Sequence, residues 1–323
     1  MSLEEKQLIL AKVESIYGND PTPTVGDNAL LTGKVSIEIA DASRERKVLL
    51  PYFGALQKIP LGEGVKISFP VEVRGSGVAT TPPRIAALLR AANLTESIGG
   101  AYVDYDPNSS AAGESCTIWF YQDGVLWKVL GCMAESVKLS AKANEIATLE
   151  FSLIGLWGGK ASVTDVSFPA PTFEATSIVP PMFRSATFTV HTYAGIIENF
   201  EVTIKNKIAK RMSANASNGI YRYSIVGREV EGSIDPELVA LSSFNPFDLW
   251  EDGDAGTITA TIGSAAGNQF VITLSNTVLT PPKLGGREGM ATYALAFTAH
   301  PTLSAGNGEI KISIGVRFVL QGI

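Results

Sequence analysis

The chain has 323 residues, more than a single hydrophobic core usually organises, so its length predicts two domains of ordinary size. Hydrophobic residues make up 45% of it and charged residues 18%, which excludes the apolar-poor composition of disordered chains. A formal net charge of −6 argues against a protein whose affinity for nucleic acid comes from neutralising phosphates, so we expect no tight binding of DNA.

The amino-terminal segment predicts a helix over residues 2–17. Ser2 and Glu5 have the spacing of a capping box, and Gly18 ends the apolar pattern that follows. The start lacks the basic region and cleavage site of a signal peptide, and the chain has no run of about eighteen apolar residues. We therefore expect a protein that is made in a cytoplasm and does not enter a membrane. The predicted apolar stripe comprises Leu8, Ile9, Val13, Ile16 and Tyr17.

Two strands are predicted next, because apolar and polar residues alternate in residues 35–40 and, more regularly, in residues 65–74. Pro70 cannot donate a hydrogen bond to a neighbouring strand, so we expect it at a sheet edge or a bulge. A long, partly basic connection joins the two strands. This connection is longer than a hairpin needs, which is typical of a loop with a contact to make.

A short helix is predicted after Pro83, and two β-hairpins follow it. Residues 116–131 predict a hairpin that turns at Asp123-Gly124, and residues 137–157 predict one that turns near Ala143-Asn144. The only two cysteines, Cys116 and Cys132, lie in these strand-like segments without metal-ligand spacing. This placement favours buried reduced thiols over a disulfide.

The proline-rich residues 161–184 predict a linker between two domains, residues 1–160 and residues 185–323. Five segments of the second domain match segments of the first in the same order, which indicates an internal repeat. The predicted inward-facing residues of the second copy include Phe200, Val202, Ile204, Tyr293, Leu295 and Phe297. The matched pairs are 35–41 with 200–206, 71–77 with 228–234, 82–89 with 235–242, 116–124 with 256–264, and 145–155 with 289–299.

The opening residues 8–31, LILAKVESIYGNDPTPTVGDNALL, and the order of strand, long basic loop, strand, helix and hairpins resemble the major tail tube proteins of long-tailed bacteriophages. The resemblance implies a mainly β fold of two tandem tail-tube-like β-sandwich domains, each with a flanking helix. It also implies a structural virion protein of the phage tail, assembled in the host cytoplasm. In that family six domains close a ring, so three copies of a two-domain chain would form one.

The resemblance further implies that the rings stack into a tube that conducts DNA into the host without binding it tightly. The implied partners are other copies of the chain, a tape measure protein and tail-terminating proteins. The sequence leaves open whether the tail contracts. Two other functions stay open as alternatives: a β-sandwich virion module that binds a carbohydrate or receptor, and the tube protein of a related contractile secretion apparatus.

No catalytic, cofactor or metal site is predicted, and we do not expect an enzyme. His191 and His300 lie in strand-like segments without a metal-binding or nucleophile motif around them. The segment 248–256 is rich in acidic residues, but they do not have the spacing of a calcium loop, and the closing glutamate of such a loop is missing.

Two basic clusters stand at equivalent places in the two halves, in the connection after the first strand. They predict a contact between stacked rings, in which cations meet an acidic surface. The alternative is a solvated loop whose charges keep the edge soluble. The clusters are Arg44, Arg46 and Lys47 in the first half and Lys205, Lys207, Lys210 and Arg211 in the second.

Three outward-facing glutamates, Glu38, Glu72 and Glu150, are candidates for the lining of the lumen. An acidic lining would repel phosphate and let DNA slide, whereas a basic lining would hold it. The alternative is a sheet face that lies against solvent outside the tube.

Overall fold

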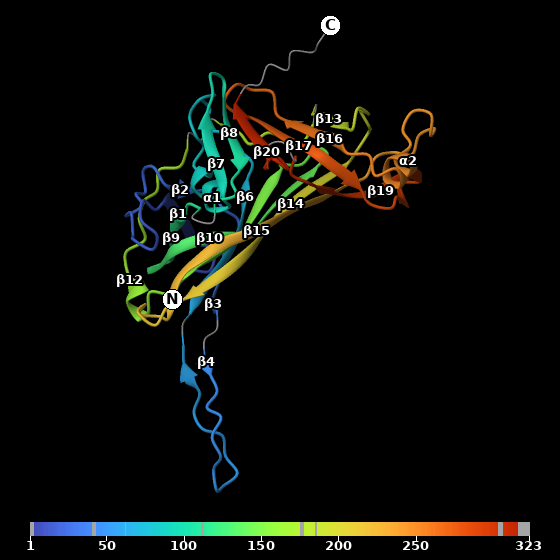
Figure 1. Ribbon diagram of the computed structural model, residues 1–323. Helices are drawn as coiled ribbons and strands as arrows, with labels where there is room; N and C mark the ends of the chain where they lie inside the picture. The colour runs from blue at the N-terminus through green and yellow to red at the C-terminus, as the bar shows by residue number, and fades with distance from the viewer. Residues whose placement is uncertain are drawn as a thin grey trace.

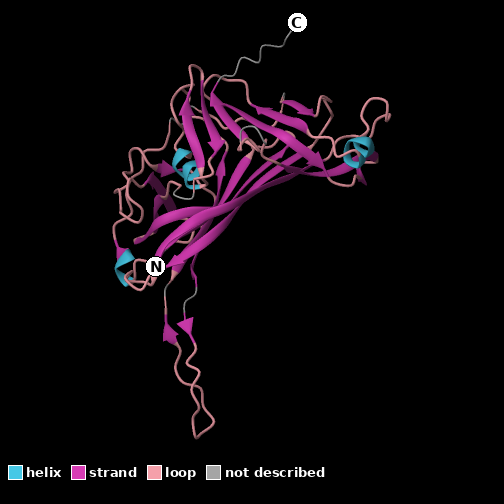
Figure 2. Cartoon of the chain, viewed as in Figure 1, coloured by secondary structure: helices cyan, strands magenta, loops and turns pink. Residues whose placement is uncertain are grey.

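The computed structural model of the chain consists mainly of β-strands, as Figures 1 and 2 show. The structure describes residues 3–40, 43–61, 63–110, 113–174, 178–184, 186–302 and 306–315. Within these residues, helix is confined to α1 (Ala86–Ala91), α2 (Pro246–Glu251) and the 3-10 turn η1 (Lys160–Ser162). The mainly β fold class expected from the sequence is confirmed.

The strands divide between the two halves of the chain. Those of the first half are β1 (Gln7–Val13), β2 (Ala29–Leu30), β3 (Ser36–Ala40), β4 (Ser43–Arg44), β5 (Ile59–Pro60), β6 (Gly64–Glu72), β7 (Leu94–Ile98), β8 (Tyr102–Pro107), β9 (Cys116–Gln122), β10 (Val125–Lys142), β11 (Thr148–Leu156) and β12 (Val163–Asp165). Those of the second half are β13 (Thr187–Val190), β14 (Asn199–Met212), β15 (Ile220–Ile234), β16 (Gly256–Ile262), β17 (Gln269–Leu279), β18 (Lys283–Arg287), β19 (Met290–Ala299) and β20 (Lys311–Gly315).

One antiparallel sheet, here called the continuous sheet, runs through both halves in the order β3-β6-β11-β10-β14-β15-β19-β18. The long strand β10 belongs to two layers. Its first part pairs with β9 in a second layer, while its last part pairs with β11 and β14 in the continuous sheet. The strand therefore carries the chain from one layer to the other.

The second layer covers one face of the continuous sheet. In the first half it contains β2, β1, β9, the first part of β10, and β12. In the second half it contains β13, β16, β17 and β20, and β20 also pairs with β8 of the β7–β8 hairpin. Two packed layers make each half a β-sandwich.

The two halves pair their strands in the same order and the same register. In the first half β3, β6 and β11 are neighbours, and in the second half β14, β15 and β19 take their places. The matches of 35–41 with 200–206 and of 145–155 with 289–299 agree with these registers. In the first half, Ser36, Ser68 and Ser152 lie directly opposite one another on the three strands. In the second half, Glu201, Ser233 and Ala296 form the corresponding row.

One sequence match disagrees with this register. The pairing of residues 71–77 with 228–234 would place Ser76 at the position of Ser233, but the strand registers place Ser68 there, so this match is wrong by eight residues (76 − 68). Short stretches of alternating residues look alike at several offsets, and only the cross-strand pairing selects one of them.

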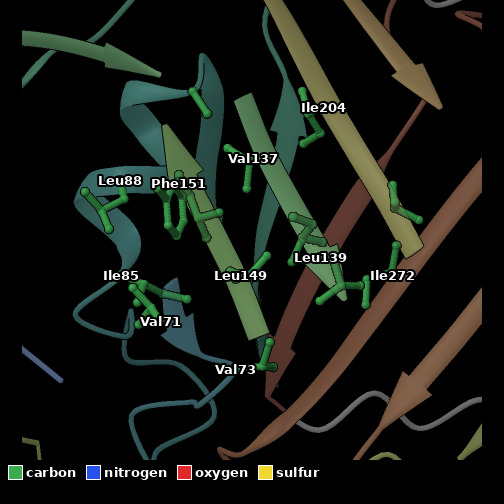
Figure 3. Packing of buried hydrophobic residues seen from close by; sticks show 14 of the residues in the cluster. Val71, Val73, Ile85, Leu88, Val137, Leu139, Leu149, Phe151, Ile204 and Ile272 are labelled. Atoms are coloured by element: carbon green, nitrogen blue, oxygen red, sulfur yellow. The ribbon is translucent and has the colours of Figure 1, made fainter. Parts of the chain in front are cut away.

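The hydrophobic core lies between the layers and continues across the boundary between the halves. Figure 3 shows Val137 and Leu139 on β10, with the neighbouring strands contributing Leu149 and Ile204 and the second layer contributing Ile272. Full burial of such side chains contributes about 1.5–3 kcal/mol each, so this boundary is part of the stabilising core. The predicted inward-facing residues of the second half are all buried: Phe200, Val202, Ile204, Tyr293, Leu295 and Phe297.

The predicted amino-terminal helix is wrong, because residues Gln7–Val13 form β1 and pair along their whole length with β9. Leu8 and Leu10 pack against one apolar cluster, and Ile9 packs into the main core on the other side. A strand buried on both faces has consecutive apolar residues, and such a run fits the helical period as well. Ser2 of the predicted capping box lies outside the described residues.

The match of residues 82–89 with 235–242 also predicts a helix that begins at Pro236, and this prediction is wrong. The chain after Pro236 stays extended beside β19, where the Tyr293 N–H donates to the Pro236 carbonyl at 2.8 Å. The helix of the second half is α2, which begins at Pro246 and is capped by Asn245, whose side chain accepts two backbone hydrogen bonds of the first turn. The helix after Pro83 is confirmed as α1, and each half has one short helix before β9 or β16.

Both predicted hairpins of the first half are confirmed. They turn at Asp123-Gly124 and around Asn144, all three with positive φ. Cys116 and Cys132 are buried and free, opposite each other on β9 and β10. Pro70 lies beyond the last β3–β6 pair, where it costs that ladder no hydrogen bond.

The segment predicted as a linker packs closely against the first half. Within residues 161–184, β12 pairs with β10, and Phe168 and Phe173 pack on the cluster that contains Leu8. The carboxylate of Glu174 accepts a hydrogen bond from the Arg84 N–H at 2.8 Å. The boundary between the two domains thus stays a prediction.

Candidate assembly surfaces

Residues 43–61 form a long arm that leaves the sandwich between β3 and β6 and projects into solvent (Figure 1, blue). At its base, β4 pairs with β5, with Ser43 opposite Pro60 and Arg44 opposite Ile59. Beyond this two-residue pairing the arm has no strand partner among the described residues. An arm of this length without a core of its own indicates a surface that another molecule completes.

The far part of the arm exposes apolar side chains. Leu49 and Phe53 are fully exposed, and Tyr52 and Val48 are mostly exposed. Contiguous exposed apolar residues on a soluble protein mark an interaction surface. The prediction from the sequence covers only the basic residues of this segment and not these apolar positions, although the run LLPYF at residues 49–53 in a loop indicates them.

The first basic cluster lies on the arm. Arg46 and Lys47 are exposed near its base, and the Arg44 guanidinium lies 3.5 Å from a Glu63 carboxylate oxygen. A second ion pair stiffens the arm, since the Lys58 ammonium lies 2.9 Å from the Glu45 carboxylate.

The second basic cluster lies on β14 of the β14–β15 hairpin, which takes the place in the second half that the β3–β6 hairpin takes in the first. Lys205 is still paired with Ser136 of β10, and the other three residues lie beyond that pairing. Lys205 pairs with Glu231 at 2.5 Å, Lys207 is exposed, and the Arg211 guanidinium lies 5.2 Å from the centre of the Tyr221 ring. The clusters therefore lie in equivalent hairpins. The predicted connection is wrong for the second cluster, because all four of its residues lie within the strand β14, which pairs with β15 there. The role of the clusters in contacts between rings stays a prediction.

The structure brings the two basic clusters together at one carboxylate. Lys210 forms an ion pair with Glu63, the same residue that Arg44 approaches. Glu63 is buried, with 5% of its surface exposed. Burial of a carboxylate is costly unless cations compensate it, so the pair fixes the base of the arm to the second half of the chain.

The three candidate lumen residues share one face of the continuous sheet, the face turned away from the core. Glu72 lies opposite Thr148, Glu150 lies opposite Pro70, and Glu38 lies on β3 beside Lys66. All three are at least partly exposed. We call this surface the polar face.

The three glutamates alone suggest an acidic surface, but the polar face carries both positive and negative side chains. Glu38 lies directly opposite Lys66, and Glu150 lies directly opposite Lys138. Lys138 also forms an ion pair with Glu201 at 3.0 Å across the boundary between the halves. Such a surface carries little net field, so it neither attracts nor strongly repels phosphate.

A comparison with protein families gives a match over residues 5–317, to the family described as phage tail tube protein. The chain belongs to the phage tail tube protein family. It is thus a structural protein of the bacteriophage virion, located in the tail, as the resemblance of residues 8–31 implied, and its family is not one of enzymes. A comparison with curated protein sequences gave no significant match.

The helices and the metal-ligating side chains of this tail tube protein show no sign of a membrane span or a metal site in the described part of the chain. Among the described residues, neither helix is long and apolar enough to cross a bilayer. In the same part of the chain, no three metal-ligating side chains gather in one place. His191 follows β13 and has a positive φ, and His300 follows β19, where its ring lies 2.9 Å from the Thr298 hydroxyl.

Proposed function

We propose that this tail tube protein polymerises as stacked rings into the tube of a phage tail, through which DNA passes during ejection. The observation that carries the proposal is the continuous sheet, which spans both halves and ends in β3 and β18. Each of these end strands has one neighbouring strand among the described residues. An unpaired sheet edge is a site for another chain to add a strand, and cyclic repetition of the unit leaves no edge open.

The proposed unit of the ring is one half of the chain. Residues 1–160 and residues 185–323 act as tandem copies of one domain, joined by residues 161–184. The identical registers of β3-β6-β11 and β14-β15-β19 support this division. Three chains then supply the six domains of a ring with approximate sixfold symmetry.

The arm is the proposed contact between rings. It projects away from the sandwich, carries the exposed cations Arg46 and Lys47 near its base and has apolar residues beyond them. Such a surface fits a neighbouring ring that offers both an apolar patch and acidic side chains.

The polar face is the proposed lining of the lumen. Its alternating lysines and glutamates, Glu38 beside Lys66 and Glu150 beside Lys138, would leave DNA without a strong counterion-releasing site. In the virion, the tube would assemble in the host cytoplasm around a tape measure protein and end at tail-terminating proteins.

Negative-stain electron microscopy and native mass spectrometry of the purified protein test the proposal. We expect rings or tubes, with a ring mass of three chains. A stable hexameric ring would contradict the two-domain stoichiometry, and dispersed monomers at high protein concentration would contradict the function itself.

A further inference from the structure

The junction between β10 and β14 joins the two halves within one chain. Residues 136–142 of β10 pair there with residues 199–205 of β14. In the second half, β18 pairs with β19 as this part of β10 pairs with β11. The strand β18 therefore holds the position that faces β14 in the first half, but in this chain nothing that the structure describes pairs with its other edge.

The equivalence of β18 with this part of β10 holds residue by residue. Leu139 lies opposite Leu149, Leu284 lies opposite Tyr293, and Leu149 corresponds to Tyr293 in the repeat. Leu284 thus corresponds to Leu139, an offset of 145 residues (284 − 139). The same offset follows independently from the second layer, where the β-bulge between Val129 and Cys132 recurs between Leu274 and Thr277 (274 − 129 = 277 − 132 = 145).

The strand β3 corresponds to β14 in the same manner. Ile37 lies opposite Ile67, Val202 lies opposite Gly232, and these pairs occupy the same place in the two registers, an offset of 165 residues (202 − 37). In this chain β3 also has one unpaired edge among the described residues. The two end strands of the continuous sheet thus correspond to the two strands of the β10–β14 junction: β18 corresponds to this part of β10, and β3 corresponds to β14.

We propose that β18 of one copy pairs antiparallel with β3 of the next copy, in the register of the β10–β14 junction. Within the chain, Leu139 lies opposite Val202 and Lys138 lies opposite Thr203. The two offsets place Leu284 opposite Ile37 of the next copy and Lys283 opposite Glu38. The inference rests on the proposed function, because a head-to-tail ring is what brings these two edges together.

The exposed apolar side chains of the two edges mark the missing neighbours. Leu284 is 73% exposed, whereas the corresponding Leu139 is 5% exposed. Ile39 is 36% exposed, whereas the corresponding Ile204 is 2% exposed. Pairing of the edges would bury Leu284 and Ile39 as the internal junction buries their counterparts, and area removed from water favours association.

The charges at the two edges are complementary in this register. Lys283 and Glu38 are exposed and would stand directly opposite each other on the polar face. A slip by one residue would turn Lys283 toward the apolar side of the partner strand, because side chains alternate between faces. The pair therefore favours one register over its neighbours.

The junction between copies would differ from the internal one at one end. Pro281 and Pro282 stand where β10 has Ser136 and Val137, and proline donates no backbone hydrogen bond. The ladder between copies is therefore shorter than the ladder within the chain. With fewer backbone hydrogen bonds, the junction between copies is expected to form after the internal β10–β14 junction and to separate before it.

Disulfide trapping tests the strand pair and its register. One preparation carries Lys283→Cys and a second carries Glu38→Cys, so that the two new thiols can meet only between copies. After mixing, ring formation and mild oxidation, we expect a covalent dimer on a non-reducing gel. The matched control replaces Glu38→Cys by Ile37→Cys, which places the thiol on the opposite face and should give at least tenfold less dimer.

The outcomes separate this inference from the proposed function. If electron microscopy shows rings but the Lys283→Cys and Glu38→Cys pair gives no more dimer than the control, the strand pair or its register is wrong while the function stands. If the unaltered protein forms no ring at any concentration, the function fails and the junction fails with it. Each cysteine variant alone, and the unaltered protein with its two buried thiols, sets the background of the gel.

Discussion

At the scale of single residues, Glu63 shows how burial determines the contribution of an ion pair to stability. The carboxylate is buried, while its partners Arg44 and Lys210 keep part of their side chains in solvent. Most surface pairs contribute little, but a buried carboxylate that loses a partner keeps the full cost of its desolvation.

We predict that Lys210→Met lowers the free energy of unfolding by about 1–3 kcal/mol, the cost of leaving a buried polar group without one of its partners. Lys207→Met is the matched control, because Lys207 lies on the same strand but is exposed, and it should change stability by less than about 0.5 kcal/mol. Urea denaturation of both variants measures the difference. Equal effects of the two substitutions would show that Glu63 does not need Lys210.

His191 provides a pH-dependent contribution to stability. Its ring is half-buried, and no described residue forms a hydrogen bond with its Nε2 atom. Burial lowers the pKa of His191, although a hydrogen bond to the Thr277 backbone and the charge of Asp254 oppose the shift. The unfolded chain therefore binds a proton at a higher pH than the folded chain does. The resulting stability is complete above the unfolded pKa of about 6.5 and is lost as the pH falls below it.

We predict that His191→Asn reduces the loss of thermal stability between about pH 6.5 and pH 5. Asparagine tolerates the positive φ at this position, so the backbone need not change. His300→Asn is the control, since these are the only two histidines of the chain. Melting temperatures measured across this pH range test the prediction, and identical pH profiles for the protein and both variants would refute it.

At the scale of elements, the arm combines two kinds of contact that respond differently to salt. Attraction between Arg44, Arg46, Lys47 and an acidic surface is screened as ionic strength rises, with a Debye length of about 8 Å at 0.15 M. Burial of Leu49 and Phe53 is not weakened in this way. Tube growth can therefore report which part of the arm carries the contact.

We predict that the combined replacement of Arg44, Arg46 and Lys47 with Ala leaves soluble rings but shortens the tubes, because ring closure depends on strand pairing. Tube length measured by electron microscopy at low and high salt checks this. Lys58→Ala is the control, since Lys58 already pairs with Glu45 within the arm. Tubes of normal length and salt response from the triple variant would mean that the basic residues only solvate the edge. In that case Phe53→Ser should shorten the tubes instead.

The elements differ in how far the sequence predicts them. Strands with one buried face, such as residues 65–74 and 200–206, alternate clearly and were predicted correctly. For residues Gln7–Val13 and the segment after Pro236 the local pattern predicts helices, because the first is buried on both faces and the second has a helix-like proline start. In both cases pairing with a strand distant in sequence decides the conformation, and a local pattern does not contain that partner.

The candidate site shows the same division. The basic clusters were found because both copies carry them, and the shared face of Glu38, Glu72 and Glu150 followed from their alternation. The apolar part of the arm and the convergence of Arg44 and Lys210 on Glu63 were not predicted. The first depends on which hydrophobic residues the fold leaves exposed, and the second depends on which charged residues the fold brings together.

At the scale of the whole molecule, the two kinds of junction should separate in order. The internal β10–β14 junction is joined by the chain and backed by the shared core, and β8 also pairs with β20 across the same boundary. The junction between copies lacks these supports and contains Pro281 and Pro282. We predict that urea dissociates rings into folded monomers before the monomers unfold.

Sedimentation and circular dichroism across one urea series measure the two steps separately. The first midpoint should rise with protein concentration, as a bimolecular contact requires, and the second should not. A single concentration-dependent transition seen by both probes would mean that the chain has no stable fold outside the assembly.

The arm belongs to the first half alone, whereas the equivalent hairpin of the second half stays paired as β14 and β15 along its length. In a ring of three chains, arms would therefore occur at every second domain. Two stacked rings could then engage in three equivalent rotational settings and not in six. Rotation of one ring by a single domain would place each arm against the wrong half of its neighbour. Only rotation by a whole chain would restore the same contacts between stacked rings.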